Sequence, residues 1–120
     1  MAARLARRIV DLSSDEAAYL AGIVDGEGSI YVRRRGEVGF PIVAITNTSV
    51  ELIEYLSMRL KGRAPRTLTP AKGATKRAYQ IEVSALNDVA YLLCALLPWL
   101  IVKRDRAVEA LRIIQERDDG

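Results

Sequence analysis

Apolar positions recur with two different periods along the chain, and these periods separate helices from strands. Residues 17–24 are apolar or small in the manner of a helix, and residues 13–16 before them are the polar and acidic types that cap and charge a helix start. Gly26 and Gly28 mark the predicted end. Residues 29–35 and 40–47 are rich in β-branched and aromatic side chains and predict a hairpin closed by residues 36–39.

The second half of the chain follows a similar order. Thr48 or Ser49 is expected to cap a second helix, which has apolar residues at helical spacing and ends at Gly62. The elements predicted after it are a weak strand at 66–69, a turn at 70–75, a strand at 76–84, a helix at 87–97 broken by Pro98, and a last helix from 103–105 to 117.

This order of elements predicts one α+β domain over residues 1–120, arranged α-ββ-α-ββ-α-α. The connection within each strand pair is too short for a crossover, so the four-stranded sheet is expected to be antiparallel, with helices on one face. The other face then has no cover within the chain.

The uncovered face is predicted to be polar and basic. Side chains two apart on a strand share a face, which places Tyr31, Arg33 and Arg35 opposite Ile30 and Val32. Lys76, Gln80, Glu82 and Ser84 likewise face away from Tyr79, Ile81 and Val83. No acid lies between Glu54 and Glu82, where basic residues gather. Such a surface indicates binding of a polyanion, above all nucleic acid, although the net charge of only +3 also fits an ordinary solvated surface.

Composition excludes several kinds of chemistry. The 120 residues include no histidine, so a Ser-His-Asp triad, a histidine-ligated zinc site and a histidine general base are impossible. Cys94, the single cysteine, lies in an apolar stretch and is predicted to be a buried, inert thiol, which suits an intracellular location in cytoplasm, nucleoid or an organelle. The apolar run 89–102 is shorter than a membrane span and contains Pro98, so we expect core segments and no membrane partner.

The first predicted helix has an unusual face. Ala18, Gly22 and Gly26 are four residues apart, with Ala17 and Ala21 beside them, so another backbone can approach closely. Each interior glycine costs about 1 kcal/mol relative to alanine, which close packing can offset. The partner in that packing is either the chain's own sheet or a second molecule, and both remain open.

Two acids follow on the same helix, at its unfavourable negative end. Asp25 and Glu27 there would be stabilised by a nearby cation. If two such helices met at a two-fold axis, paired Glu27 carboxylates would repel unless a divalent metal lay between them. Oxygen ligands without histidine or thiolate favour Mg²⁺, and the alternative is an ordinary pair of surface acids.

Residues 20–28, Leu-Ala-Gly-Ile-Val-Asp-Gly-Glu-Gly, resemble the signature of the LAGLIDADG homing endonucleases. The αββαββα order and Pro98-Trp99-Leu100 before Lys103 extend the likeness over almost the whole chain, and the single motif resembles the homodimeric branch. The resemblance implies a saddle-shaped sheet and an intron- or intein-associated endonuclease. It would hydrolyse both strands of a long, partly palindromic DNA site with Mg²⁺, which Mn²⁺ or Ca²⁺ could replace.

The resemblance also implies roles for individual residues. Glu27 and the Gly26 carbonyl would hold metal, while Asn47 and Lys103 would organise water and stabilise charge on phosphate. The implied dimer interface comprises Ala18, Ala21, Gly22 and Asp25. The implied DNA contacts are Tyr31, Arg33, Arg35, Ala44, Thr46, Arg66, Lys76, Gln80 and Glu82. Glu27 stands at the motif position where the family usually has aspartate. A catalytically inactive maturase, a DNA- or RNA-binding regulator and a protein interaction module are the alternatives.

Overall fold

The elements of the chain follow the predicted order. A computed structural model describes residues 9–60, 66–68 and 77–119. Its elements are α1 (Ser14–Glu27), β1 (Gly28–Arg35), β2 (Val38–Asn47), α2 (Val50–Leu60), β3 (Arg66–Leu68), β4 (Ala78–Val83), α3 (Leu86–Leu96) and α4 (Arg104–Asp119). Within these ranges no helix combines the length and apolar character needed to cross a membrane.

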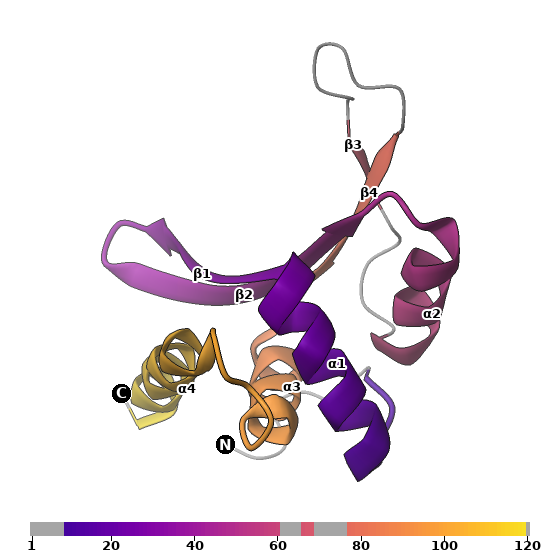
Figure 1. Ribbon diagram of the computed structural model, residues 1–120. Coiled ribbons are helices and arrows are strands. Elements are labelled where there is room, and N and C mark those ends of the chain that lie inside the picture. The colour runs from indigo at the N-terminus through magenta and orange to yellow at the C-terminus, as the bar shows by residue number, and fades with distance from the viewer. Residues whose placement is uncertain (1–8, 61–65, 69–76, 120) are drawn as a thin grey trace.

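The four strands form one antiparallel sheet in the order β1-β2-β4-β3. Figure 1 shows the helices on one side of this curved sheet, while the concave opposite face is bare. The predicted α+β fold, with helices on one face, is therefore confirmed. We call the bare side the open face.

The first hairpin is tighter than predicted. Strand β2 begins at Val38, and only Gly36 and Glu37 form the turn. Gly36 has a φ of 61°, a conformation that two-residue hairpin turns require and that glycine adopts without strain. The glycine at position 39 suggested a longer turn, but it pairs with Arg34 inside the ladder.

Polar side chains fix the starts of the first two helices, as expected. Ser13 and Glu16 form a reciprocal capping box at α1, in which each side chain accepts a backbone N–H of the other at 3.2 Å. Ser49 caps α2 by accepting the N–H of Leu52 at 3.2 Å. Arg59 of α2 then pairs with Glu16 at 2.6 Å and joins the two helices.

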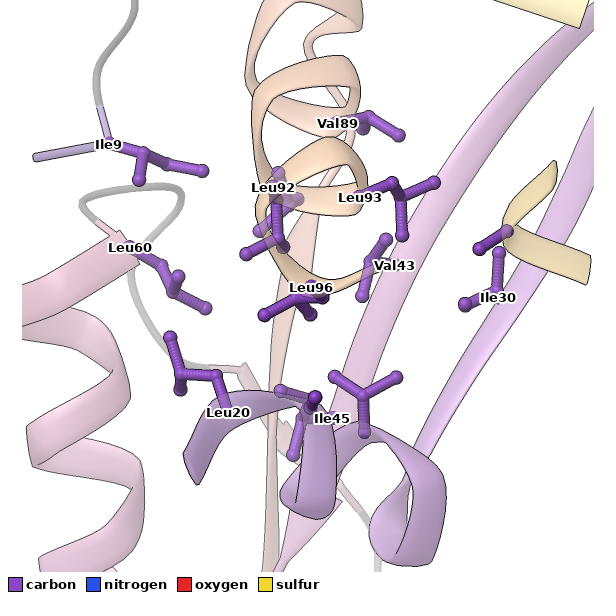
Figure 2. Packing of buried hydrophobic residues seen from close by; sticks show 14 of the residues in the cluster. Ile9, Leu20, Ile30, Val43, Ile45, Leu60, Val89, Leu92, Leu93 and Leu96 are labelled. Carbon is purple, nitrogen blue, oxygen red and sulfur yellow. The ribbon is translucent and has the colours of Figure 1, made fainter. Parts of the chain in front are cut away.

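The core lies between the sheet and the helices. Val43 and Ile45 of β2 point towards Leu20 of α1 and Leu93 of α3 in Figure 2. Ile81 and Val83 of β4 are buried in the same cluster, so the predicted inward face of β4 is confirmed.

Two predictions of burial are wrong. Cys94 is exposed, because α3 buries the positions on its other side, such as Leu92, Leu93 and Leu96. Three residues at the end of the apolar run 89–102 are also at the surface, with Trp99 46%, Ile101 83% and Val102 73% exposed, although Leu100, which lies between them, is buried. The three exposed residues lie in the connection between α3 and α4, outside any helix, so the helical spacing of apolar residues does not determine which way they face.

Candidate active site at the end of the first helix

Glu27 stands at an abrupt junction between helix and sheet. It is the last residue of α1, and β1 begins with the next residue, Gly28. The Gly28 N–H donates to the Val24 carbonyl, and a Cβ atom at Gly28 would lie 2.9 Å from the Val24 Cα. Only glycine fits this approach, so the last glycine of the motif lets the chain leave the helix immediately after the exposed Glu27.

Asn47 holds the Glu27 side chain. It ends β2, and its Nδ2 donates to Glu27 Oε1 at 3.0 Å. Its Oδ1 accepts the N–H of Ser49 at 2.8 Å, which fixes the other side of the amide. Glu27 and Asn47, predicted to act together, are therefore in direct contact.

Lys103 contacts the same helix end one residue before Gly26. Its Nζ donates to the Asp25 carbonyl at 2.7 Å. A carbonyl in the last turn of a helix has no partner within the helix, and a cation there interacts favourably with the helix dipole.

The Asp25 carboxylate binds the loop before α4. It accepts the backbone N–H groups of Ile101 at 2.8 Å, Val102 at 3.2 Å and Lys103 at 3.0 Å. We call this arrangement the Asp25 clasp. Desolvation raises the pKa of Asp25, but the three N–H groups and the charge of Lys103 outweigh it, so the pKa lies below its ordinary value of 3.8. The clasp therefore keeps Asp25 ionised and places Lys103 beside the helix end.

The donor set at this end fits a hard divalent cation. The Glu27 carboxylate and the Gly26 carbonyl of the last turn are oxygen donors, which Mg²⁺, Mn²⁺ and Ca²⁺ accept. Within the described ranges, no three His, Cys, Asp or Glu side chains gather at one point. A metal bound here therefore takes its remaining ligands from water, phosphate or a second copy of the chain.

The open face carries a connected set of polar side chains. Glu82 accepts hydrogen bonds from Tyr31 and Arg33, both at 3.2 Å, although these residues are about fifty positions away in the chain. Gln80 donates to Thr46 at 3.2 Å, and Arg35 lies 5.8 Å from the Phe40 ring. The face is polar and arginine-bearing, as predicted.

Three of the expected DNA contacts need separate comment. Ala44 lies on the open face but is only 4% exposed, because it is enclosed by its neighbours on β1 and β4, so it has almost no surface to offer. That expectation is wrong for this structure. Lys76 and the side chain of Arg66 lie outside the described residues.

The small residues of α1 divide between two faces. Ala17 and Ala21 are buried in the chain's own core, at 4% and 0% exposure. Ala21 is therefore not an interface residue, since the sheet and helices of its own chain already cover it. Gly22 and Gly26 are exposed, and a Cβ atom at either would meet nothing within 4 Å. The chain's own core therefore accounts for Ala17 and Ala21, whereas Gly22 and Gly26 belong to the other, exposed face.

Comparison with known proteins supports the resemblance of the first half of the chain. Residues 14–64, which include the motif at 20–28, match the family model for the LAGLIDADG-like domain. No curated protein sequence matches the chain significantly.

Solved structures share the fold of this chain over most of its length. The homing endonuclease I-TnaI has 18% identity and a TM-score of 0.68, with 92% of this chain and 77% of that chain covered. I-CvuI, in complex with its target, has 20% identity and a TM-score of 0.65, with 86% and 68% covered. The archaeal intron-encoded I-Vdi141I, complexed with DNA, has 21% identity and a TM-score of 0.62, with 88% and 70% covered.

Sequence reasoning misses two features near the LAGLIDADG motif. The apolar pattern predicts core at Ile101 and Val102, which are instead exposed and held by the Asp25 clasp. Arg106, on the first turn of α4, donates to the Ile30 carbonyl at 3.5 Å. The sequence does contain three basic residues between 103 and 106, and this cluster could have indicated a basic side chain near the motif.

Proposed function

We propose that the chain is a subunit of a homodimeric, metal-dependent endonuclease that hydrolyses both strands of a long, partly palindromic DNA duplex. The observation that carries the proposal is the contact of Glu27 with Asn47 at 3.0 Å, at the point where α1 joins the sheet. An exposed acid is held there beside a polar face, and Lys103 lies at the same helix end. I-Vdi141I and I-CeuI, which share this fold, are described as complexed with DNA.

The proposed chemistry is phosphodiester hydrolysis. Glu27 and the Gly26 carbonyl would hold Mg²⁺, whose positive charge stabilises the negative charge that builds up around phosphorus. Asn47 orients the Glu27 carboxylate through its hydrogen bond. The Lys103 ammonium donates one proton to the Asp25 carbonyl and has two left for phosphate oxygens or water. A water oxygen bonds to phosphorus, the P–O3′ bond breaks, and the products are a 5′-phosphate and a protonated 3′-hydroxyl.

The open face would bind the duplex. It is concave in Figure 1 and presents arginine, tyrosine, glutamine and threonine, which provide hydrogen-bond donors and acceptors suited to base edges in a major groove. Arg33 and Arg35 are exposed and can also neutralise phosphates.

The outer face of α1 would form the dimer interface. Gly22 and Gly26 offer open space for the backbone of a second α1, and Tyr19 is 56% exposed on the same helix. Ile101 and Val102, clasped to the end of α1, are exposed apolar side chains that a second copy would cover. Two Glu27 carboxylates would then approach one another and share bound metal.

Selection of cleaved molecules from a randomised duplex library, with magnesium present, tests the proposal. We expect recovery of related sequences cut on both strands, and no cutting when magnesium is replaced by EDTA. Enrichment by binding without any cutting would instead support the regulator or maturase alternative. I-CvuI is described in one complex as holding DNA that is not cleaved in the presence of magnesium, so binding and cutting need separate assays.

A further inference from the structure

A cationic cavity lies between the start of β1 and the start of α4. It has a volume of about 460 Å³ and is lined by Ser29, Ile30, Tyr31, Lys103 and Arg106. Its lining within the described residues contains two cations and no acid. The hydroxyl group of Ser29 adds neutral hydrogen-bonding capacity, whereas the Tyr31 hydroxyl is engaged with Glu82 and Arg33.

Both cations are held in place and keep donors to spare. Lys103 is fixed by its contact with the Asp25 carbonyl and by the Asp25 clasp. Arg106 donates through Nη1 to the Ile30 carbonyl, which occupies one of its five N–H groups. Each side chain is therefore positioned before any ligand arrives.

The acids near these two cations lie outside the lining of the cavity. Asp105 and Glu109 line a second cavity, which shares Arg106 with the cationic one. Glu109 is also paired with Arg112, one turn further along α4. The charge of Lys103 is partly offset by the ionised Asp25 beside it, so Arg106 is the main positive charge that the lining presents to the cavity.

The cavity adjoins the candidate active site along the chain. Ser29 follows Glu27 by two residues, a separation of about 7 Å in extended backbone. Lys103 belongs to both places, because it contacts Asp25 at the helix end and also lines the cavity. A ligand in the cavity would therefore lie beside the candidate active site.

We propose that this cavity binds a backbone phosphate of the DNA, with Arg106 as its main ligand. The inference rests on the proposed function for the source of the phosphate, since the cavity's chemistry alone selects a tetrahedral oxyanion. Arg106 would act as a positioning residue that holds the DNA backbone in register with Glu27.

The variant Arg106→Gln tests this site, with Arg104→Gln as the matched control. Arg104 is two residues away, is exposed, and donates to the Leu97 carbonyl, so its replacement changes the net charge equally without touching the cavity. Binding of a mixed-sequence duplex is measured at several NaCl concentrations. The logarithm of the binding constant falls as the logarithm of the salt concentration rises. We expect Arg106→Gln to make this negative slope shallower by about 0.9 for each phosphate that the protein no longer neutralises, and Arg104→Gln to change it clearly less.

A second measurement separates the cavity from the proposed function. Inorganic phosphate should raise the melting temperature of the parent protein, relative to chloride of equal ionic strength, but raise that of Arg106→Gln less. If inorganic phosphate raises the melting temperature of the parent more than that of Arg106→Gln, and the duplex does not bind, the phosphate site in the cavity is supported and the endonuclease proposal fails. Equal phosphate responses in both proteins, or equal salt slopes for the two variants, would overturn the cavity proposal.

Discussion

At the scale of residues, the chemistry gathers at the end of α1, but the partners come from distant parts of the chain. Asn47 reaches Glu27 from the end of β2, and Lys103 reaches Asp25 across 78 positions. These contacts also explain why acids are tolerated at the negative end of a helix. The negative charge of Asp25 is stabilised by three backbone N–H groups and by the nearby ammonium of Lys103. The Glu27 carboxylate is stabilised by the side-chain amide of Asn47.

Glu27→Gln should abolish cutting and preserve DNA binding. The amide has nearly the same shape but lacks the negative charge that holds a divalent cation, so we expect the cleavage rate to fall by more than about 100-fold. The rate is measured under single-turnover conditions on a selected site, and binding is measured in parallel by fluorescence anisotropy. Glu37→Gln, in the exposed hairpin turn, is the control and should cut normally. Undiminished cutting by the Glu27 variant would contradict the assigned role.

Asp25→Asn should destabilise the fold and make its stability less sensitive to acid. The amide presents an N–H group to backbone donors, so at neutral pH we expect a decrease of about 1–3 kcal/mol in the free energy of unfolding. The pKa of Asp25 is lowered in the folded chain. Its stabilising contribution is therefore complete above the ordinary value and disappears as the pH falls through the lower folded value.

Urea unfolding between pH 7 and pH 3 measures both effects of the Asp25 change. The parent should lose stability more steeply than Asp25→Asn towards the acid end of this range. Asp15→Asn, at the exposed start of the same helix, should cost only about 0.3–1 kcal/mol through the helix dipole. Parallel pH profiles for parent and Asp25→Asn would show that the clasp does not depend on ionisation.

At the scale of elements, α1 serves two different surfaces. Its inner face packs Ala17, Leu20, Ala21 and Val24 against the core, while its outer face exposes Gly22 and Gly26. Both faces contain small residues, so residue type alone does not separate them. The separation follows from how α1 is rotated relative to the sheet, which depends on its contacts with α3 and β2.

Gly22→Leu should leave the single chain folded and separate the dimer. A Cβ atom at Gly22 meets nothing within 4 Å, and leucine favours helix over glycine by roughly 1 kcal/mol. The melting temperature should therefore hold or rise in dilute solution, where the subunits are apart. Sedimentation velocity at increasing concentration should show dimers for the parent and monomers for the variant.

Gln115→Leu is the matched control for this change, because it adds an exposed leucine to α4, away from α1. It should sediment like the parent. A Gly22→Leu protein that still forms dimers would place the interface elsewhere.

At the scale of the whole molecule, the sheet separates two environments. The helices lie on its convex side in Figure 1, together with the core. The other side carries the polar network of Tyr31, Arg33 and Glu82. Arg112 and its partners Glu109 and Glu116 lie on α4, on the helix side, where the charges are paired. Arg33 on the open face is likewise paired with Glu82, so under the proposed function the two arginine groups differ in the face they occupy and not in pairing.

The double variant Arg33→Gln, Arg35→Gln should weaken binding of a mixed-sequence duplex and flatten its salt dependence. Each phosphate left without its arginine should make the negative slope of log K against log salt shallower by about 0.9, where K is the binding constant for the duplex. Arg112→Gln, which removes a charge from the helix side, should leave the slope unchanged. Equal effects from the two sets would mean that net charge, and not the open face, governs binding.

Much of this organisation is predictable, because periodicity and capping residues report local structure. The eight elements, the capping box at Ser13 and the inward face of β4 all follow from patterns within a few residues. The predictions for Ala44, Cys94 and Ile101 are wrong because their burial depends on neighbours that are distant in sequence. The Asp25 clasp is likewise invisible in the sequence, since backbone N–H groups leave no trace in side-chain identity.

The exposed position of Cys94 on α3 makes the unmodified protein a ready subject for distance measurement. Because each chain has a single cysteine, one nitroxide spin label can be attached per copy without any mutation. Two copies related by a two-fold axis place the two labels at one fixed separation. Double electron–electron resonance would then report the arrangement of the subunits directly, and would show whether bringing in a duplex changes it.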